Sequence, residues 1–224
     1  MITSWTEVTD RNPDHSRNYI ARWESFEAQG RDIDGEARLI DALASDGDRI
    51  LDAGAGTGRL AGYLAARNAA TADVATGDTG RNLQLTGVDI DPVLVDYARG
   101  RYPGVDWHTG DLSVDAEVPA SPFDLIVSAG NVLAFIPDPA HRAALGVLKD
   151  RLAPGGRLVV GFGLDRGRDH DAFSGDAAAV GLRITQEYSS WDLRPRGCGA
   201  ADTAPDAGFL VAILEATEPE VPHE

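Results

Sequence analysis

The fold is decided by one stretch of the chain, Arg49-Ile50-Leu51-Asp52-Ala53-Gly54-Ala55-Gly56-Thr57-Gly58-Arg59-Leu60. Residues 50–53 form a short apolar run that predicts a buried strand. Three alternating glycines then predict a loop, and the residues that follow predict a helix to about residue 69. Glycines let a backbone turn sharply and approach a ligand closely, and the following helix offers free N–H groups and a partial positive charge. The stretch therefore predicts a strand, loop and helix that together bind a small ligand.

The spacing of these glycines separates two kinds of ligand. A dinucleotide-binding loop follows the pattern Gly-x-Gly-x-x-Gly, which, counted from Gly54, needs a glycine where this chain has Arg59. Asp52, two residues before the loop, is poorly placed beside a pyrophosphate and suits a ligand with an ammonium group. The pattern favours such a ligand and leaves an NAD(P)-linked oxidoreductase on a similar sheet as the alternative.

Short apolar runs alternate with helical patterns along most of the chain. Strands are predicted over residues 50–53, 83–88, 105–108, 125–127, 158–162, 184–191 and 209–214. Helices are predicted within 13–48, after the glycine loop to about residue 69, from Asp91-Pro92 onwards, and over 138–152 and 171–180. Strands that alternate with helices form a parallel sheet covered on both faces, whereas the last two strands lack a helix between them and should pair antiparallel. We expect an α/β fold with a doubly wound, mostly parallel seven-stranded sheet, its last strand antiparallel, and helices on both faces.

Turn and cap residues divide this pattern into parts. Asp91-Pro92 and Asp138-Pro139 each predict a helix start, because aspartate caps a helix and proline fits its first turn. Pro154-Gly155-Gly156 predicts a turn before the fifth strand. We expect residues 1–48 to form an N-terminal helical cap and residues 49–224 to form one core domain. Residues 70–82 contain few side chains that could bury apolar surface, which predicts a flexible insertion.

The decisive stretch also resembles a known family. Residues 50–58 resemble motif I of the class I S-adenosylmethionine (SAM)-dependent methyltransferases, and four later segments resemble the family's motifs in the same order and spacing. These segments are residues 85–91, 110–112, 123–131 and 152–158. The resemblance extends over roughly residues 35–215 and is to small bacterial members of the family. Each motif alone is weak evidence, but five in register are strong.

The resemblance implies a cofactor and the residues that contact it. It implies that SAM is the methyl donor, S-adenosylhomocysteine (SAH) the product, Asp89 the partner of the ribose hydroxyls and Asp111 a neighbour of the adenine amino group. The implied cofactor residues are Tyr19, Trp23, Asp52, Gly54, Ala55, Gly56, Gly58, Asp89, Ile90, Asp111, Leu112, Ala129 and Asn131, with no metal. Plainer roles stay open, since Asp111 could cap a turn, Asp52 could hold the loop, and Tyr19 and Trp23 could be the apolar face of a packed helix.

The methyl acceptor is less well marked. A protein with a net charge of −16 repels the phosphate backbone of nucleic acids, which binding proteins usually contact with basic residues. The Asn/Asp-Pro-Pro-Tyr motif of base methylation is missing, because the corresponding residues are Ala129-Gly130-Asn131-Val132. We therefore expect a small-molecule acceptor and no nucleic acid. A protein acceptor and a SAM-binding relative that does not methylate remain alternatives.

The catalytic base and the cellular compartment rest on fewer residues. Of the histidines, His170 is the favoured candidate base over His15 and His141, because it follows the fifth strand at the edge where such sheets bind ligands. The chain lacks an apolar run of roughly 20 residues, so we expect no membrane partner. A lone cysteine, Cys198, and the absence of a secretory pattern predict a cytoplasmic protein. Nothing in the sequence indicates an oligomeric state.

Overall fold

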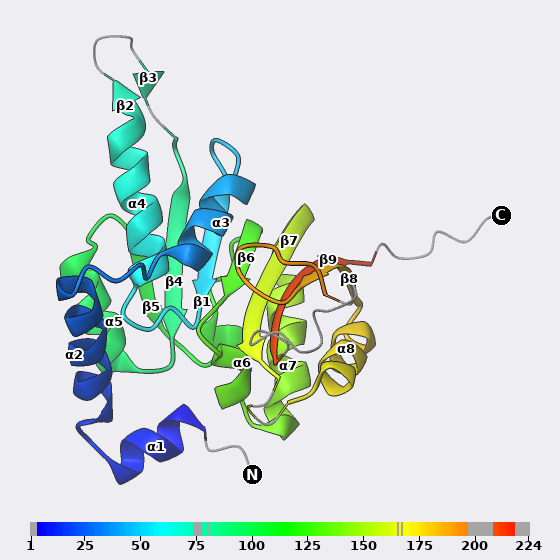
Figure 1. The fold of residues 1–224 in the computed structure, drawn as a ribbon. Coiled ribbons are helices and arrows are strands. Elements are labelled where there is room, and N and C mark those ends of the chain that lie inside the picture. The colour runs from blue at the N-terminus through cyan, green and yellow to red at the C-terminus, as the bar shows by residue number, and fades with distance from the viewer. Residues whose placement is uncertain are drawn as a thin grey trace.

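A seven-stranded mixed sheet forms the centre of the molecule (Figure 1). The computed structural model describes residues 4–73, 78–79, 81–164, 166, 168–196 and 208–217. The strands are β1 (Arg49–Ala53), β4 (Gln84–Asp89), β5 (Asp106–Thr109), β6 (Phe123–Ser128), β7 (Leu152–Gly163), β8 (Leu182–Tyr188) and β9 (Phe209–Ala216), in the order β5-β4-β1-β6-β7-β9-β8. β9 runs antiparallel to both of its neighbours, β7 and β8, and the other pairings are parallel. The predicted fold class is confirmed.

Helices cover both faces of this sheet. They are α1 (Trp5–Arg11), α2 (His15–Ala28), α3 (Gly35–Leu43), α4 (Arg59–Thr71), α5 (Pro92–Arg101), α6 (Val132–Phe135), α7 (Asp138–Asp150), α8 (His170–Ala179) and the short 3-10 helix η1 (Asp115–Glu117). The buried residues of α3, α4 and α5 share one apolar cluster with the sheet, and those of α6, α7 and α8 share the other. Alternate residues of a strand serve the two clusters, as Val159 and Val160 of β7 do, because successive side chains point to opposite faces.

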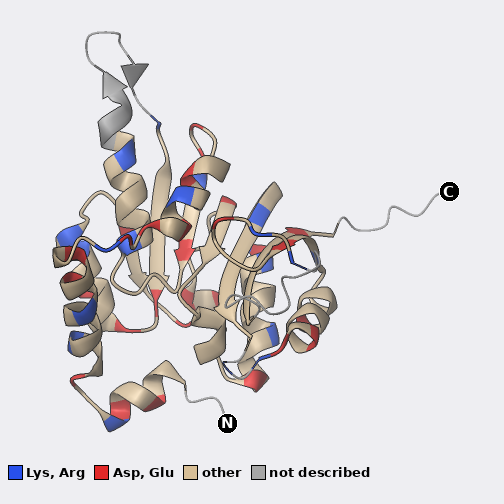
Figure 2. Ribbon diagram, viewed as in Figure 1, with Lys and Arg blue, Asp and Glu red and all other residues tan. Residues whose placement is uncertain are grey.

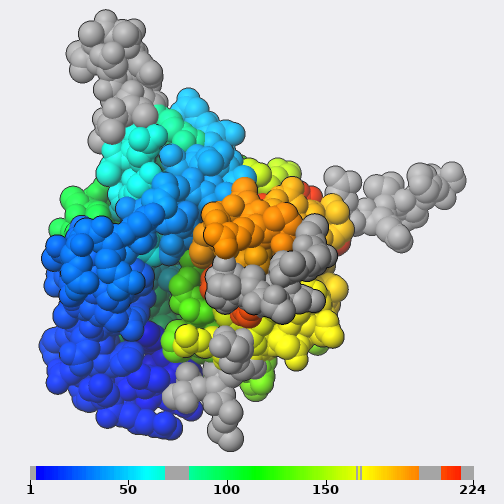
Figure 3. Space-filling view, viewed as in Figure 1, coloured from blue at the N-terminus to red at the C-terminus, as the bar shows by residue number. Residues whose placement is uncertain are grey.

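The N-terminal helices are bound to this core to different degrees. α3 buries Ala37, Leu39 and Ile40, whereas α1 has no buried residue and α2 buries only Ser16. Figure 3 shows the blue N-terminal segment lying against the cyan and green parts of the molecule, with a hollow beside the green segment. The division of the chain at residue 48 stays a prediction, but α3 packs as part of the core.

Some local predictions differ from the structure. Asp91 caps α5 as expected, but α7 has Pro137 at its cap position and Asp138 inside its first turn, where the carboxylate pairs with Arg168 instead. The prediction that Asp138 caps the helix is therefore wrong. The predicted turn at residues 154–156 lies within β7, where the register with β6 shifts between Phe123 and Leu125, so the turn is a bulge.

Two further regions bear on the predictions. Within the predicted 70–82 insertion, the first residues form the end of α4, and β2 (Ala72–Asp73) pairs with β3 (Asp78–Thr79) in a short antiparallel ribbon. Residues 74–77 and 80 lie outside the described residues. Cys198 also lies outside them. Among the helices that the structure describes, none is long and apolar enough to cross a membrane.

The strand order creates a position where a ligand can bind. From β1 the chain continues to β4 and β5 on one side, and then returns to β6 on the other side of β1. Loops that leave the carboxyl ends of β1 and β6 therefore diverge, and open α/β sheets bind ligands in the crevice at such a switch point.

Candidate functional site

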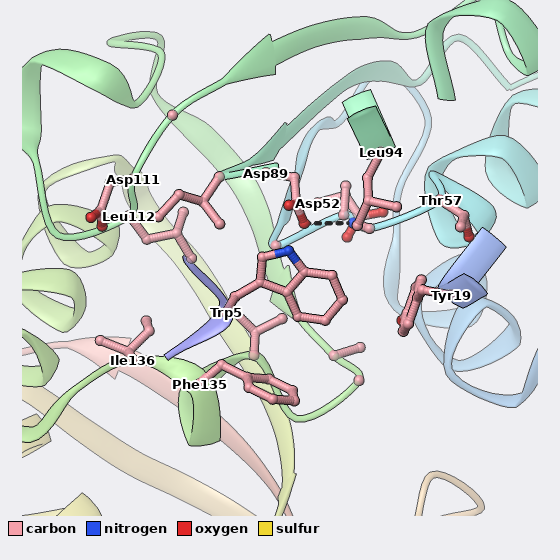
Figure 4. A pocket seen from close by; sticks show the side chains of 18 of the residues that line it. Trp5, Tyr19, Asp52, Thr57, Asp89, Leu94, Asp111, Leu112, Phe135 and Ile136 are labelled. Carbon is pink, nitrogen blue, oxygen red and sulfur yellow. Dashed lines mark hydrogen bonds between the residues drawn. The ribbon is translucent and has the colours of Figure 1, made fainter. Parts of the chain in front are cut away.

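A cavity of about 250 Å³ lies at the carboxyl ends of β1, β4, β5 and β6. Its lining residues come from the loops after these strands, from the N-terminal helices, and from the segment that begins with α6 (Figure 4). The four strand ends contribute Gly54–Thr57, Asp89–Ile90, Gly110–Ser113 and Ala129–Gly130. The cavity thus lies at the switch point of the sheet.

The glycine loop is held to the end of β4 by its own backbone. The N–H groups of Gly54 and Ala55 both donate to the carbonyl of Val88, at 2.8 and 3.0 Å, and the N–H of Gly56 donates to the Asp89 carboxylate at 2.7 Å. These three N–H groups of the loop bond to the protein itself. The loop is therefore positioned before any ligand binds.

The glycines of the loop differ in what they face. Gly56 has a φ of +57°, and a Cβ added there would meet only the ring and hydroxyl of Tyr19, at 3.6 to 3.7 Å, so this face borders the cavity. At Gly58, a Cβ would lie 2.6 Å from Trp107 and 2.8 Å from Ala98. Gly58 does not line the cavity, because its role is to let α4 pack closely against β5 and α5.

Asp52 is a buried carboxylate at the end of β1. The residue is 3% exposed, and its Oδ2 accepts a hydrogen bond of 3.2 Å from the N–H of Ala61 in the first turn of α4. Burial raises the pKa of Asp52 to about 7. The residue therefore joins β1 to the start of α4 and also borders the cavity, while its contact with a ligand stays a prediction.

Asp89 occupies the matching position at the end of β4. One carboxylate oxygen accepts from Gly56 as described, and the other accepts from the N–H of Asp91 at 2.9 Å. Burial raises the pKa of Asp89 to about 6. Two buried carboxylates thus border one cavity, and a cationic ligand would favour their ionised forms.

On the far side of the cavity, Asp111 begins a tight turn. Its Oδ1 accepts from both the backbone N–H and the hydroxyl of Ser113, each at 2.8 Å, and its own N–H donates to Glu117. The turn-capping role left open by the sequence is therefore present, and Asp111 lines the cavity as well. The neighbouring Leu112 is buried and supplies an apolar surface there.

Most of the predicted cofactor residues share this cavity. Its lining includes Tyr19, Trp23, Asp52, Gly54, Ala55, Gly56, Asp89, Ile90, Asp111, Leu112 and Ala129. Burial raises the pKa of Tyr19, whose hydroxyl lies over Gly56. Asn131 is not among the lining residues, because its Oδ1 accepts from the N–H of Gly163 at 2.7 Å and joins the start of α6 to the end of β7.

The candidate base is not brought to the cavity. His170 begins α8, where its Nε2 contacts the carboxylate of Glu187 on β8, and it is not a lining residue. His15 packs against the ring of Trp5, and His141 is fully buried between α7 and α8. His170 follows the fifth strand of the sheet, as predicted, but its side chain contacts β8 and not the cavity.

Sequence reasoning missed one wall of the cavity. This wall is aromatic and apolar and consists of Trp5, Phe135, Ile136, Pro137 and Ala140. A signal for α1 was present in Ser4-Trp5-Thr6-Glu7, which matches a capping box, and the Ser4 hydroxyl does accept from the N–H of Glu7. The apolar residues of α6 had no such signal, since four residues are too few to show a helical period.

A pH-dependent stability follows from Asp52. Because its pKa is about 7 in the folded protein and near 3.9 when exposed, the folded state binds the proton more tightly. Stability is therefore lost as the pH rises from about 4 to 7, by up to roughly 4 kcal/mol. We expect Asp52→Asn, which stays neutral, to be more stable than wild type at pH 8 and to lose that advantage towards pH 5. Thermal unfolding across this range measures the difference, and an equal or lower melting temperature at pH 8 would contradict the assignment.

Known proteins resemble this chain in sequence and in fold. A family model described as a methyltransferase domain matches residues 50–156. A TehB-like SAM-dependent methyltransferase from Corynebacterium glutamicum is 42% identical, with 92% of this chain and 100% of that chain covered and a TM-score of 0.79. A search of curated proteins gave no match.

Two more distant structures share the fold. The N-methyltransferase NodS from Bradyrhizobium japonicum, solved with SAH, is 21% identical with a TM-score of 0.58, covering 82% of this chain and 86% of its own. The SAM-bound amino pentose methyltransferase CalS10 from Micromonospora echinaspora is 19% identical with a TM-score of 0.60, covering 86% and 96%. With the fold, the family model and the 42% identical relative in agreement, the chain belongs to the SAM-dependent methyltransferases of the class I fold.

Proposed function

We propose that this protein transfers a methyl group from SAM to a small-molecule acceptor, and that the cavity at the strand ends is its active site. The single observation that carries the proposal is the pair of buried carboxylates, Asp52 and Asp89, on either side of the glycine loop. Bound there, SAM supplies an electrophilic methyl group on a positively charged sulfur. The residues around it have to hold the cofactor, align the acceptor and exclude water.

The cofactor side of the cavity has groups that suit each part of SAM. Asp89 has a carboxylate beside the loop that can accept from both ribose hydroxyls, as carboxylates do at this position in dinucleotide folds. Asp52 offers negative charge to the ammonium group, and Asp111 with Leu112 offers a polar edge and an apolar surface for the adenine. The open face of Gly56 leaves the backbone room for close approach.

The acceptor side is the aromatic and apolar wall of Trp5, Phe135, Ile136, Pro137 and Ala140. Trp5 and Phe135 meet nearly edge to face, with ring centroids 5.6 Å apart. Such a wall removes water from the reacting atoms and packs against an apolar portion of a small molecule. We therefore infer that the acceptor has an apolar body and enters between α1 and α6.

Surface charge supports a small acceptor over a nucleic acid. The chain carries a net charge of −16, and Figure 2 shows Lys and Arg scattered among Asp and Glu instead of gathered on one element. Within the described part of the chain, Arg59 is the arginine that lines the cavity, and it is ion-paired with Glu36 and stacks on Trp23. A phosphate backbone would meet little basic surface at this site. We propose the reducing cytoplasm as the place of the reaction.

Cofactor binding tests the first half of the proposal. Isothermal titration calorimetry should show that SAM and SAH both bind the wild type, and that Asp89→Ala weakens binding by about 2–3 kcal/mol because charged hydrogen bonds are lost. Asp96→Ala is the matched control, since Asp96 is an exposed carboxylate on α5 that pairs with Arg99. If wild type does not bind at millimolar ligand, the proposal is overturned. If Asp89→Ala binds SAM as tightly as wild type does, the assignment of the cofactor to this cavity is wrong.

Methyl transfer tests the second half. Wild-type protein incubated with methyl-labelled SAM and a cell extract should place label in the small-molecule fraction, and Asp89→Ala should place much less there. The extract is separated by size and then by nuclease and protease treatment, so that each class of acceptor is counted. Label found only in nucleic acid or protein would contradict the proposed acceptor class.

A further inference from the structure

Asp91 makes more contacts than a helix cap needs. Its Oδ1 accepts from the N–H of Val93 at 2.9 Å, which caps α5. Its Oδ2 accepts from the indole Nε1–H of Trp5 at 2.8 Å and from the hydroxyl of Ser16. Its own N–H donates to Asp89. The sequence predicted only the cap, yet this one buried residue joins α1, α2 and α5 to a carboxylate of the cavity.

The N-terminal helices depend on these contacts because they bury little else. α1 has no buried residue, and the buried residue of α2 is Ser16, the same residue that donates to Asp91. Exposed pairs such as Arg101 with Glu27 also join α2 to α5, but ion pairs in water add little stability. Beside the partly buried aromatic contacts of Trp5 and Trp23, the carboxylate of Asp91 is therefore the buried polar group that joins both helices to α5.

Trp5 connects that position to the cavity. Its indole lies in the centre of the lining seen in Figure 4, between Tyr19 and Phe135. The ring centroids of Trp5 lie 5.3 Å from Tyr19 and 5.6 Å from Phe135, with interplanar angles of 87° and 90°. A shift of α1 would thus remove this ring from the cavity lining.

We propose that Asp91 is a positioning residue that, through Trp5 and Ser16, holds α1 and α2 across the cavity and limits how fast the cofactor product leaves. The inference rests on the proposed function, since it takes SAH as the ligand of this cavity. Trp5 touches the ligand space, and Asp91 acts on it through the indole hydrogen bond. Ligand release requires this wall to move, so loss of that bond speeds release.

The test compares dissociation rates of SAH measured by stopped-flow fluorescence. Trp5→Phe keeps an aromatic ring and removes only the donor, whereas Asp91→Asn keeps a side chain that caps helices well. Each substitution should raise the dissociation rate about tenfold, the effect expected for losing one hydrogen bond to a charged group. The double variant Trp5→Phe/Asp91→Asn should be no faster than Asp91→Asn alone, because both changes remove the same bond.

Asp96→Asn, an exposed carboxylate of the same helix, is the control and should leave the rate unchanged. If wild type fails to bind SAH in calorimetry, the proposed function fails first. If wild type binds SAH, but Trp5→Phe and Asp91→Asn release it at the wild-type rate, the inference alone is overturned. Effects that multiply in the double variant would also overturn it, since the two residues would then act independently. Trp5→Phe keeps the test valid even if Asp91→Asn does not fold.

Discussion

The attachment of the glycine loop to the end of β4 is the interaction on which the site depends. Gly54 and Ala55 donate to Val88, and Gly56 donates to Asp89, so three successive N–H groups of the loop are bonded to the neighbouring strand. This requires β1 and β4 to be adjacent and parallel, with Ala53 opposite Val88, as they are. The same bonds bring the carboxylates of both strand ends to one cavity, so the site exists because the sheet has this order.

The site places two carboxylates in buried positions at the strand ends. Burial raises the pKa of Asp52 to about 7 and that of Asp89 to about 6, which means that each carboxylate is costly to ionise in the folded protein. A cationic ligand with hydroxyl donors would offset that cost, because it would add positive charge and further hydrogen bonds beside the two carboxylates. Asp91 connects this part of the site to the N-terminal helices. Its N–H donates to Asp89, while its carboxylate accepts from Trp5 of α1 and Ser16 of α2.

The sequence predicted the sheet because its strands and helices follow local rules, whereas the residues of the cofactor side were implied by the family resemblance. Apolar runs, caps and glycine spacing are short-range patterns, and the loops after β1, β4 and β5 reach one cavity in any sheet of this order. The acceptor side followed no such rule. Trp5 and Phe135 meet only after folding brings α1 beside α6, and Asp91 showed its cap but not its partners 75 and 86 residues away. The sequence could not show that His170 lies away from the cavity for the same reason, since no local pattern indicates that the start of α8 contacts β8.

A crystal structure of the protein with SAH tests the central claim most directly, namely that the buried carboxylates at the strand ends form the cofactor site. The account predicts both ribose hydroxyls within hydrogen-bonding distance of Asp89, the adenine beside Asp111 and Leu112, and the sulfur directed towards Trp5 and Phe135. SAH bound elsewhere, or bound in this cavity with its ribose away from Asp89, would contradict it.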